Sequence, residues 1–233
     1  MKPKTWAYGV TTTVERLDTL LPLTLASLEK AGFDNPRLFV DGWEGPTLEF
    51  RPFNLEITTH YPAVRTFGNW ILALWELNIR QPQATYYALF QDDFVTYPNL
   101  REYLEKSGMP EQGYCNLLTF MDNEDLVTKK AGWIQSHQMG RGAVALVFNR
   151  EAILALLAQP HLASKPRVSG IGHYKKIDGS IVEAMRQAGF PEYIHSPSLV
   201  QHTGDKTSIG NNVPHKAKSF RGEDFDSLQL LKE

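Results

Sequence analysis

Residues 86–94 read YYALFQDDF, a run of apolar and aromatic residues that leads into Gln91 and two adjacent carboxylates, Asp92 and Asp93. A short apolar run without polar alternation is typical of a strand that is buried on both faces. Such strands occur in parallel sheets that carry helices on both sides. The run therefore predicts an α/β fold in which the two carboxylates lie where a central strand ends.

The same pattern extends outward in both directions. Leu17, Leu21, Leu25 and Leu28 recur at helical spacing, and Gly32 is placed to end that helix. Further helices are expected at residues 66–79, 98–106, 151–158 and 180–188, and further strands at residues 6–10, 37–40, 55–58, 114–120, 143–148 and 199–201. Because strands and helices alternate over the first 120 residues, we expect a Rossmann-like α/β/α sandwich with a mostly parallel central sheet.

Length, charge and cysteine content narrow the class of protein. The 233 residues suit one domain, and a formal net charge of −2 gives no overall field that would attract DNA or an anionic membrane. Cys115 is the single cysteine, which excludes an intrachain disulfide and a cysteine-rich zinc site. No apolar run is long enough for a signal peptide or a membrane span, so we expect a cytoplasmic protein.

Polar residues follow several of the predicted strands, at the edge of the sheet where α/β proteins bind ligands. They are Thr11, Thr12, Thr13, Asp41, Asp92 and Asp93. Adjacent carboxylates repel each other and need a compensating cation, and hard oxygen ligands select Mg²⁺ or Mn²⁺. The acidic pair therefore favours a divalent metal site, although one aspartate capping a turn beside a solvated neighbour would produce the same pair.

A second cluster, QHTGDKTSIGN at residues 201–211, combines an imidazole, a lysine and several hydroxyls. These groups suit a diphosphate, with Lys206 as a point charge, Thr207 and Ser208 as donors and His202 as a metal ligand. A glycine-containing turn with incidental polar residues is the alternative.

A third cluster, KKIDGSIVE at residues 175–183, contains the pattern Ser180-x-x-Glu183, which is typical of a helix capping box. With Ser180 as the N-cap, Asp178 projects from the preceding loop and could act as a general base. A surface ion pair of Asp178 with Lys175 or Lys176 is the alternative.

Other residues are candidate contacts to a substrate, and each could equally have a structural role. Arg65 and Asn69 open a predicted helix, whose N-terminus could meet phosphate. An aromatic ring can stack on a sugar, which makes the segment around Trp133 a candidate acceptor site. The remaining candidates are Arg16 and Asp41 on the nucleotide side and His137 on the acceptor side.

The acidic motif FQDDF (90–94) and the C-terminal segments LVQHTG (199–204) and TSI (207–209) resemble motifs of GT-A glycosyltransferases. The acidic motif is similar to their metal-binding motif in a contiguous form. The C-terminal segments are similar to the QHxG…SSL tail of N-glycan β-1,4-N-acetylglucosaminyltransferases of the fourth type, with Thr207 where that tail has Ser.

The resemblance implies an inverting, metal-dependent transfer of a sugar from a nucleotide-sugar, expected to be a UDP-sugar, to an acceptor hydroxyl. Asp93 would be the principal Mn²⁺ or Mg²⁺ ligand, Asp92 a sugar or ribose contact, His202 a metal or diphosphate contact and Asp178 the base. Residues 1–120 would bind the nucleotide-sugar, residues 121–204 would form the acceptor side, and residues 205–233 would be a tail. The acceptor stays open among glycans, lipids, proteins and a hydroxylated DNA base.

Two other functions share these features. A nucleotidyltransferase usually carries a glycine-rich loop with Lys or Arg after the first strand, whereas GVTTT (9–13) has one glycine and no basic residue. A non-catalytic sugar-binding module would tolerate loss of the acids or of the tail motif, and both are present. Product analysis separates the three.

Overall fold

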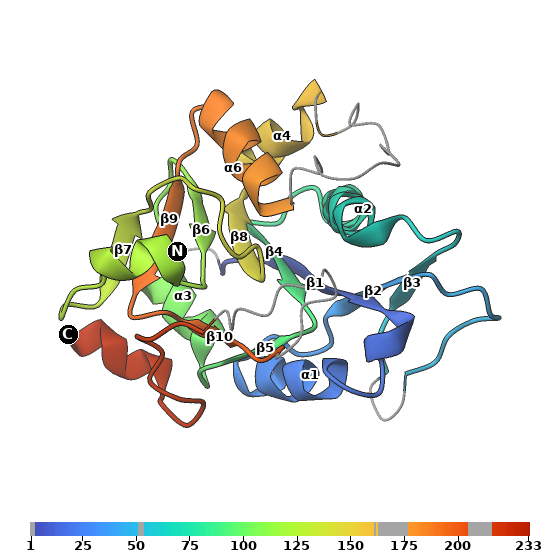
Figure 1. Cartoon of the computed structure of the whole chain (residues 1–233), viewed down its shortest axis with the longest axis horizontal. Coiled ribbons are helices and arrows are strands. Elements are labelled where there is room, and N and C mark those ends of the chain that lie inside the picture. Colours follow the sequence, from blue (N-terminus) through green and yellow to red (C-terminus); the bar gives the residue numbers. More distant parts are fainter. Residues whose placement is uncertain (1–2, 51–53, 161, 163–176, 205–215) are drawn as a thin grey trace.

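The computed structural model describes residues 3–50, 54–160, 162, 177–204 and 216–233. Its described strands form an eight-stranded sheet and a separate two-stranded ribbon (Figure 1). In spatial order the sheet consists of β3 (Ile57–His60), β2 (Arg37–Asp41), β1 (Trp6–Thr13), β4 (Tyr86–Gln91), β8 (Ala145–Asn149), β6 (Tyr114–Asn116), β9 (Glu192–Ser196) and β7 (Gly132–Gln135). The ribbon pairs β5 (Phe94–Thr96) with β10 (Val200–His202).

The strand directions confirm the predicted fold class. β3, β2, β1 and β4 are mutually parallel, and so are β6 and β9, whereas β8 and β7 run antiparallel to their neighbours. The sheet is therefore mostly parallel and Rossmann-like, with the polar ends of four adjacent strands along one edge.

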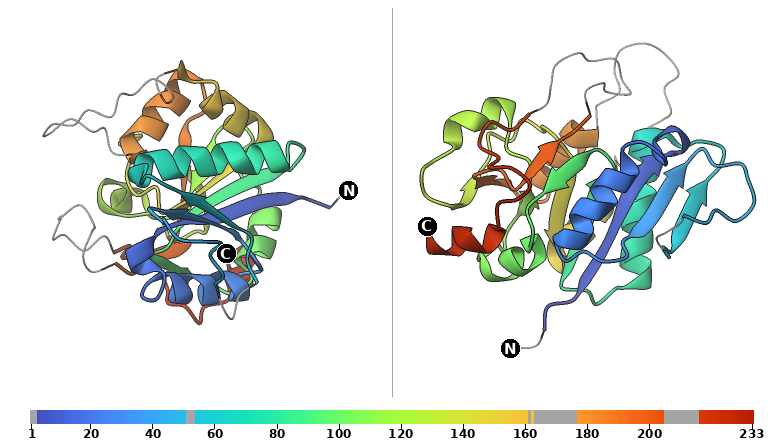
Figure 2. Two further views of the ribbon diagram at one scale, coloured as in Figure 1. Left: turned by 90° about the vertical axis from the view of Figure 1, so that its right-hand side faces the viewer. Right: turned by 90° about the horizontal axis from the view of Figure 1, so that it is seen from below.

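Helices cover both faces of the sheet, as Figure 2 shows for α2 and α1 on opposite sides. The described helices are α1 (Leu21–Lys30), α2 (Arg65–Arg80), α3 (Leu100–Lys106), α4 (Arg150–Leu157) and α6 (Ile177–Gln187), with short 3-10 helices at Val14–Arg16, Met121–Leu126 and Ser227–Lys232. Among the helices of the described residues, none combines the length and apolar character that crossing a bilayer requires.

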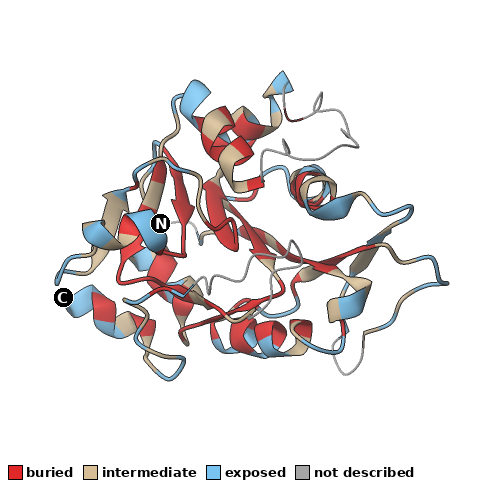
Figure 3. Cartoon of the chain, viewed as in Figure 1, coloured by how far each residue is buried: buried red, intermediate tan, exposed pale blue. Residues whose placement is uncertain are grey.

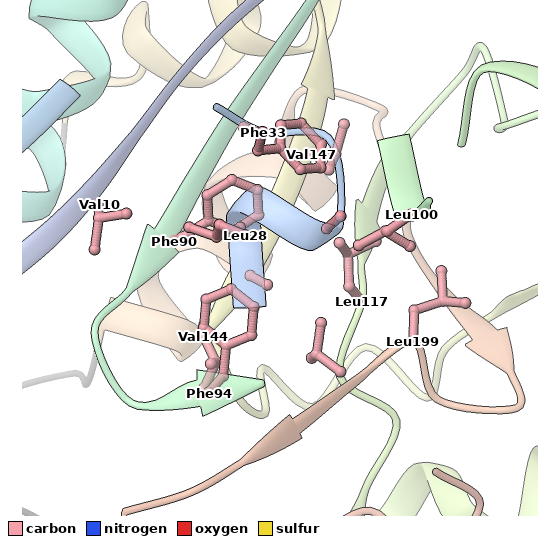
Figure 4. Close-up of a cluster of buried hydrophobic side chains, with 14 of the residues drawn as sticks. Val10, Leu28, Phe33, Phe90, Phe94, Leu100, Leu117, Val144, Val147 and Leu199 are labelled. Carbon is pink, nitrogen blue, oxygen red and sulfur yellow. The ribbon is translucent and has the colours of Figure 1, made fainter. Parts of the chain in front are cut away.

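The side chains of β4 show why its sequence is apolar without alternation. Ala88 and Phe90 belong to the hydrophobic cluster on the α1 and α3 side, whereas Tyr87 and Leu89 belong to the cluster on the α2, α4 and α6 side. All four are fully buried. Figure 3 shows the central strands mainly in the colour of buried residues, and Figure 4 shows Phe90 within the first cluster. Successive strand residues point to opposite faces, so a strand between two helical layers has to be apolar throughout.

The end of α1 also follows its sequence. Gly32 has a φ of 87°, and its N–H donates to the carbonyl of Glu29, while the N–H of Phe33 donates to that of Leu28. This is the Schellman arrangement, which requires a residue with positive φ at this position. The predicted helix end at Gly32 is confirmed.

The proposed capping role of Ser180 was wrong. α6 begins at Ile177 within the described residues, so Ser180 lies inside the helix and is fully buried. The S-x-x-E pattern was misleading because the same spacing occurs within a helix, where Ser180 lies on the buried face. Asp178 consequently lies in the first helical turn, not in a preceding loop.

Residues 216–233, expected to belong to a tail, pack against the rest of the domain. Phe220 stacks on Tyr97 with ring centroids 4.7 Å apart, and Ser227 Oγ donates to the carbonyl of Pro98. Leu230 is buried in the core. The guanidinium of Arg221, one of the basic residues in this segment, forms two short hydrogen bonds with the Glu233 carboxylate. The segment is therefore part of the packed domain.

Candidate functional site

The acidic pair lies at the carboxyl end of β4, where the sequence places it. Asp92 and Asp93 are 2% and 4% exposed. The chain then turns into β5, which lies beside β10 (Figure 1), and the register of the pair sets His202 opposite Phe94. The N–H of Thr203 donates to the backbone carbonyl of Asp93 over 2.8 Å. The ribbon thus joins the acidic motif to the first residues of the C-terminal motif.

Arg16 bridges the two carboxylates. Its Nη1 lies 2.6 Å from Asp92 Oδ1 and 2.9 Å from Asp93 Oδ2, and the hydroxyl of Thr12 donates to Asp92 Oδ2 over 2.5 Å. The expected compensating cation is therefore present in the chain itself. Repulsion between adjacent carboxylates does not by itself require a metal here.

The two carboxyl groups differ in acidity. Burial raises the pKa of Asp92, and the charge of Asp93 adds to this, against the opposing effects of Arg16 and Thr12. Burial also acts upward on the pKa of Asp93, but the hydrogen bonds and charges of His202 and Arg16 outweigh it, so that this pKa is lowered. Asp93 is therefore the member of the pair that most readily carries a negative charge.

The strongest argument for a metal ion is a carboxylate oxygen of Asp93 that makes no hydrogen bond within the described residues. Asp93 Oδ1 is buried and has no hydrogen-bond partner in the described part of the chain, and the same holds for the hydroxyl oxygen of Thr203. His202 Nε2 lies 3.3 Å from Asp93 Oδ2. A buried oxygen without a partner is costly and needs an explanation, such as an ion.

The ligand atoms of the site fit a metal ion whose coordination sphere is completed by the substrate. No group of three or more His, Cys, Asp or Glu side chains converges within the described residues. Mg²⁺ is usually held by one or two carboxylates together with substrate phosphates, so the Asp93 carboxylate would suffice on the protein side, with His202 as an additional contact. A Cβ at Gly204 would lie 2.9 Å from His202 Cε1 and 3.4 Å from Asp93 Oδ2, so glycine keeps this space open.

The predicted nucleotide contacts at the end of β1 have different roles in the structure. Thr11 is buried and its hydroxyl donates to the carbonyl of Phe90, which links β1 to β4. Thr12 is bonded to Asp92, as described above. Thr13 is half-buried and precedes the 3-10 helix that carries Arg16. Thr12 and Arg16 are therefore the residues that β1 and its following turn bring to the acidic pair.

Asp41 has a structural role that the sequence did not predict. Its Oδ1 and Oδ2 accept the backbone N–H groups of Val64 and Arg65, each over 2.8 Å. The carboxylate thus caps the start of α2, and these N–H groups are engaged by Asp41, not free for a phosphate. The expectation that this helix end meets phosphate through these groups is therefore corrected.

Asn69 links three strands at the same edge. It is 3% exposed, and its Nδ2 lies 3.3 Å from the carbonyl oxygen of Thr12 and 3.1 Å from that of Phe39. Its Oδ1 lies 3.0 Å from Nδ1 of His60, the last residue of β3. Sequence reasoning missed His60, because the predicted strand stopped at residue 58.

Asp178 is connected to the end of β4 through a short segment. Its Oδ2 accepts the N–H of Gly142 over 3.1 Å, and the carbonyl of the next residue, Ala143, accepts from Nε2 of Gln91 over 2.9 Å. Gln91 directly precedes the acidic pair. The alternative partners Lys175 and Lys176 lie outside the described residues.

A buried glutamate that sequence reasoning missed holds the loop leading to Gly142. Glu192 accepts hydrogen bonds from Ser136 Oγ over 2.6 Å and from Asn116 Nδ2 over 3.2 Å. Asn116 Nδ2 also donates to the carbonyl of Arg141 over 2.8 Å. Burial raises the pKa of Glu192, against these hydrogen bonds. A glutamate beside an apolar strand end gives no sequence signal for such a role.

The proposed acceptor residues lie elsewhere. Trp133 is on β7, separated from β4 by four inter-strand spacings, or about 19 Å. Its indole N–H donates to Ser107 Oγ, and His137 Nε2 lies 2.9 Å from Asp125 Oδ1 at the surface. The structure does not bring them to the acidic pair. Lys206, Thr207 and Ser208 lie outside the described residues.

Comparisons with known proteins bear on the fold. The sequence matches no protein-family model and no curated protein sequence. One similar solved structure is a nucleotidyl transferase from Methanothermobacter thermautotroptrophicus, with a TM-score of 0.50 and 12% identity, covering 82% of this chain and 86% of that chain. At this identity the likeness supports the Rossmann-like fold alone.

Proposed function

We propose that the protein is a nucleotide-dependent transferase, and specifically a metal-dependent GT-A glycosyltransferase that moves a sugar from a nucleotide-sugar to a hydroxyl. One observation carries the proposal. The two motifs that resemble those of glycosyltransferases, distant in sequence, meet in space through the contacts of Asp93 with His202 and Thr203. They meet at the carboxyl edge of a mostly parallel sheet, where such folds bind nucleotides.

In this proposal the chain supplies positive charge for the departing diphosphate. Arg16 and His202 both contact Asp93 Oδ2, so phosphate oxygens placed beside it would meet a guanidinium and an imidazole. A metal held by Asp93 and His202 would act as a Lewis acid toward the same oxygens. Thr12 and Arg16 keep Asp92 in place beside the sugar.

The acceptor hydroxyl needs a base. The new bond forms between the acceptor oxygen and the anomeric carbon, the bond from that carbon to the diphosphate oxygen breaks, and the hydroxyl proton passes to Asp178. The loop that Glu192 holds orients Asp178 through Gly142. A single base without an enzyme nucleophile corresponds to inversion at the anomeric carbon.

A nucleotidyltransferase is the second candidate, because the similar solved structure carries that name. The two reactions release different products. Glycosyl transfer, or slow transfer to water, releases a nucleoside diphosphate from a nucleotide-sugar, whereas nucleotidyl transfer from a nucleoside triphosphate releases pyrophosphate.

The test incubates the protein and Mn²⁺ with UDP-, GDP-, CDP- and ADP-sugars and, separately, with the four nucleoside triphosphates and sugar 1-phosphates. We expect a nucleoside diphosphate from a nucleotide-sugar, with loss of this activity in Asp93→Asn and retention in Asp125→Asn. Asp125 is the control because it pairs with His137 at the surface. Release of pyrophosphate alone would establish the second candidate, and no release from any donor would refute both.

A further inference from the structure

The hydrogen bonds of Asn69 fix the orientation of its amide. Its two N–H groups point to the carbonyl oxygens of Thr12 and Phe39, at 3.3 Å and 3.1 Å. The reverse orientation would place the amide oxygen against two carbonyl oxygens, neither of which can donate. Asn69 Oδ1 therefore faces His60 as an acceptor.

This orientation fixes the tautomer of His60. Its Nδ1 lies 3.0 Å from Asn69 Oδ1, so Nδ1 must carry the hydrogen. In a neutral imidazole the other nitrogen, Nε2, is then an acceptor. His60 is half-buried, and Nε2 is not among the buried unpaired atoms and makes no hydrogen bond within the described residues. An acceptor with a fixed lone pair is thus open at the end of β3.

The position of His60 suits contact with the nucleoside of the donor. β3, β2, β1 and β4 are parallel, so their carboxyl ends share one edge, and β3 lies three spacings, about 14 Å, from β4. A nucleotide held by its phosphates beside Asp93 extends along this edge. Asp41 at the end of β2 has both oxygens bonded to the start of α2. Beyond it, His60 Nε2 is an acceptor that has no partner among the described residues.

We infer that His60 recognises the nucleobase of the donor, by accepting a ring N–H at Nε2. The inference rests on the proposed function and adds the class of base. Uracil and guanine present a ring N–H at their pairing edge. Cytosine and adenine present a ring nitrogen lone pair there, which would face the lone pair of Nε2. The site therefore discriminates against cytosine and adenine.

The experiment measures binding of UDP, CDP and 3-methyl-UDP in Mn²⁺ by calorimetry, for the wild-type protein and for His60→Phe. Methylation at N3 removes the ring N–H and leaves the diphosphate unchanged. We expect the wild type to bind UDP about three- to tenfold more tightly than the other two, the scale of one hydrogen bond. His60→Phe should bind all three alike, because phenylalanine keeps a ring and removes the acceptor.

His137→Phe is the matched control, because it makes the same change at an exposed histidine that follows β7, the strand at the opposite edge of the sheet from β3. It should keep the wild-type preference, and His60→Ala should repeat the result of His60→Phe. Equal wild-type affinity for UDP and 3-methyl-UDP, or an unchanged preference in both His60 variants, would overturn the inference while leaving the proposed function intact. Absence of binding of UDP, CDP and 3-methyl-UDP alike would instead refute the proposed function.

Discussion

His202 Nε2 lies 3.3 Å from Asp93 Oδ2, although the two residues are distant in the sequence. The pairing of β10 with β5 produces this contact, because it sets His202 opposite Phe94. Asp93 Oδ1, the second oxygen of the same carboxylate, is buried without a partner in the described part of the chain. The protein thus holds one oxygen of this carboxylate, and we propose that a ligand binds the other.

Asp93→Asn tests the ligand role of this carboxylate. The change keeps the size of the side chain and removes its charge. We therefore expect nucleotide-sugar affinity in Mn²⁺ to fall by at least about tenfold, as mutations around metal sites typically reduce metal affinity by about 10- to 100-fold. Calorimetry in Mn²⁺ and in EDTA is the measurement. Equal affinity of variant and wild type in Mn²⁺ would contradict the assignment.

Arg16→Met tests the internal counter-ion. Removing one partner of a buried ion pair leaves an uncompensated charge, and we expect the free energy of unfolding near neutral pH to fall by about 3 kcal/mol. Arg16 opposes the effect of burial on the pKa of Asp92, so without Arg16 the folded protein holds a proton on Asp92 still more tightly than the unfolded chain does. The stability lost on replacing Arg16 should therefore be smaller at about pH 5 than at about pH 7.5.

Urea denaturation at the two pH values measures this effect. Asp92→Asn in the Arg16→Met background should recover part of the lost stability, because it removes one of the two repelling charges. A loss that is independent of pH would show that Arg16 acts by packing alone.

The burial of His195 predicts a second pH dependence of the free energy of unfolding. Burial lowers its pKa from 6.5 to about 4, and its Nε2 and Nδ1 bond to Tyr103 Oη and the carbonyl of Pro197. The unfolded chain therefore takes up this proton first, and stability is lost as the pH falls from above 6.5 toward 4. We expect this group to remove about 2 kcal/mol between about pH 7.5 and about pH 5.

The comparison of wild type with His195→Asn isolates the effect, since other groups titrate in both. The variant should be less stable at neutral pH and should show a shallower dependence of its unfolding free energy on pH. Parallel curves for the two proteins would contradict the prediction.

Asp178→Asn tests the base. The asparagine Oδ1 can still accept the N–H of Gly142, so the first turn of α6 should keep its structure. A general base contributes about 10² to 10⁴ in rate, and we expect kcat to fall by about 10² or more with donor affinity unchanged. Asp122→Asn is the control, because Asp122 pairs with Arg141 at the surface. Unchanged turnover, or retention of anomeric configuration by NMR, would refute the role.

The elements that sequence predicted well are those with strong local signals. β4 could be recognised because burial on both faces requires an apolar residue at every position. α1 could be delimited because Gly32 adopts a positive φ that its end requires. β5, β7 and β9 were missed because they are short and their pairing partners are distant in sequence.

Site residues were harder to assign, because one residue type serves several purposes. Asp41 and Asp92 both follow apolar strands, yet one caps α2 and the other pairs with Arg16. Their local sequences do not reveal the difference, which depends on what packs against each strand end. The divalent metal site stays a prediction, now supported by the unpaired oxygen of Asp93 in place of charge repulsion.

The sequence by itself determined the layered α/β architecture and the edge at which polar residues gather, because periodicity and helix ends depend on neighbours in the chain. Only the tertiary structure decided which polar groups are engaged and which are open. Arg16 bridges the acidic pair, and Asn69 orients His60, through hydrogen bonds between distant segments. Such bonds depend on distances and directions that exist only after the strands have paired and the helices have packed.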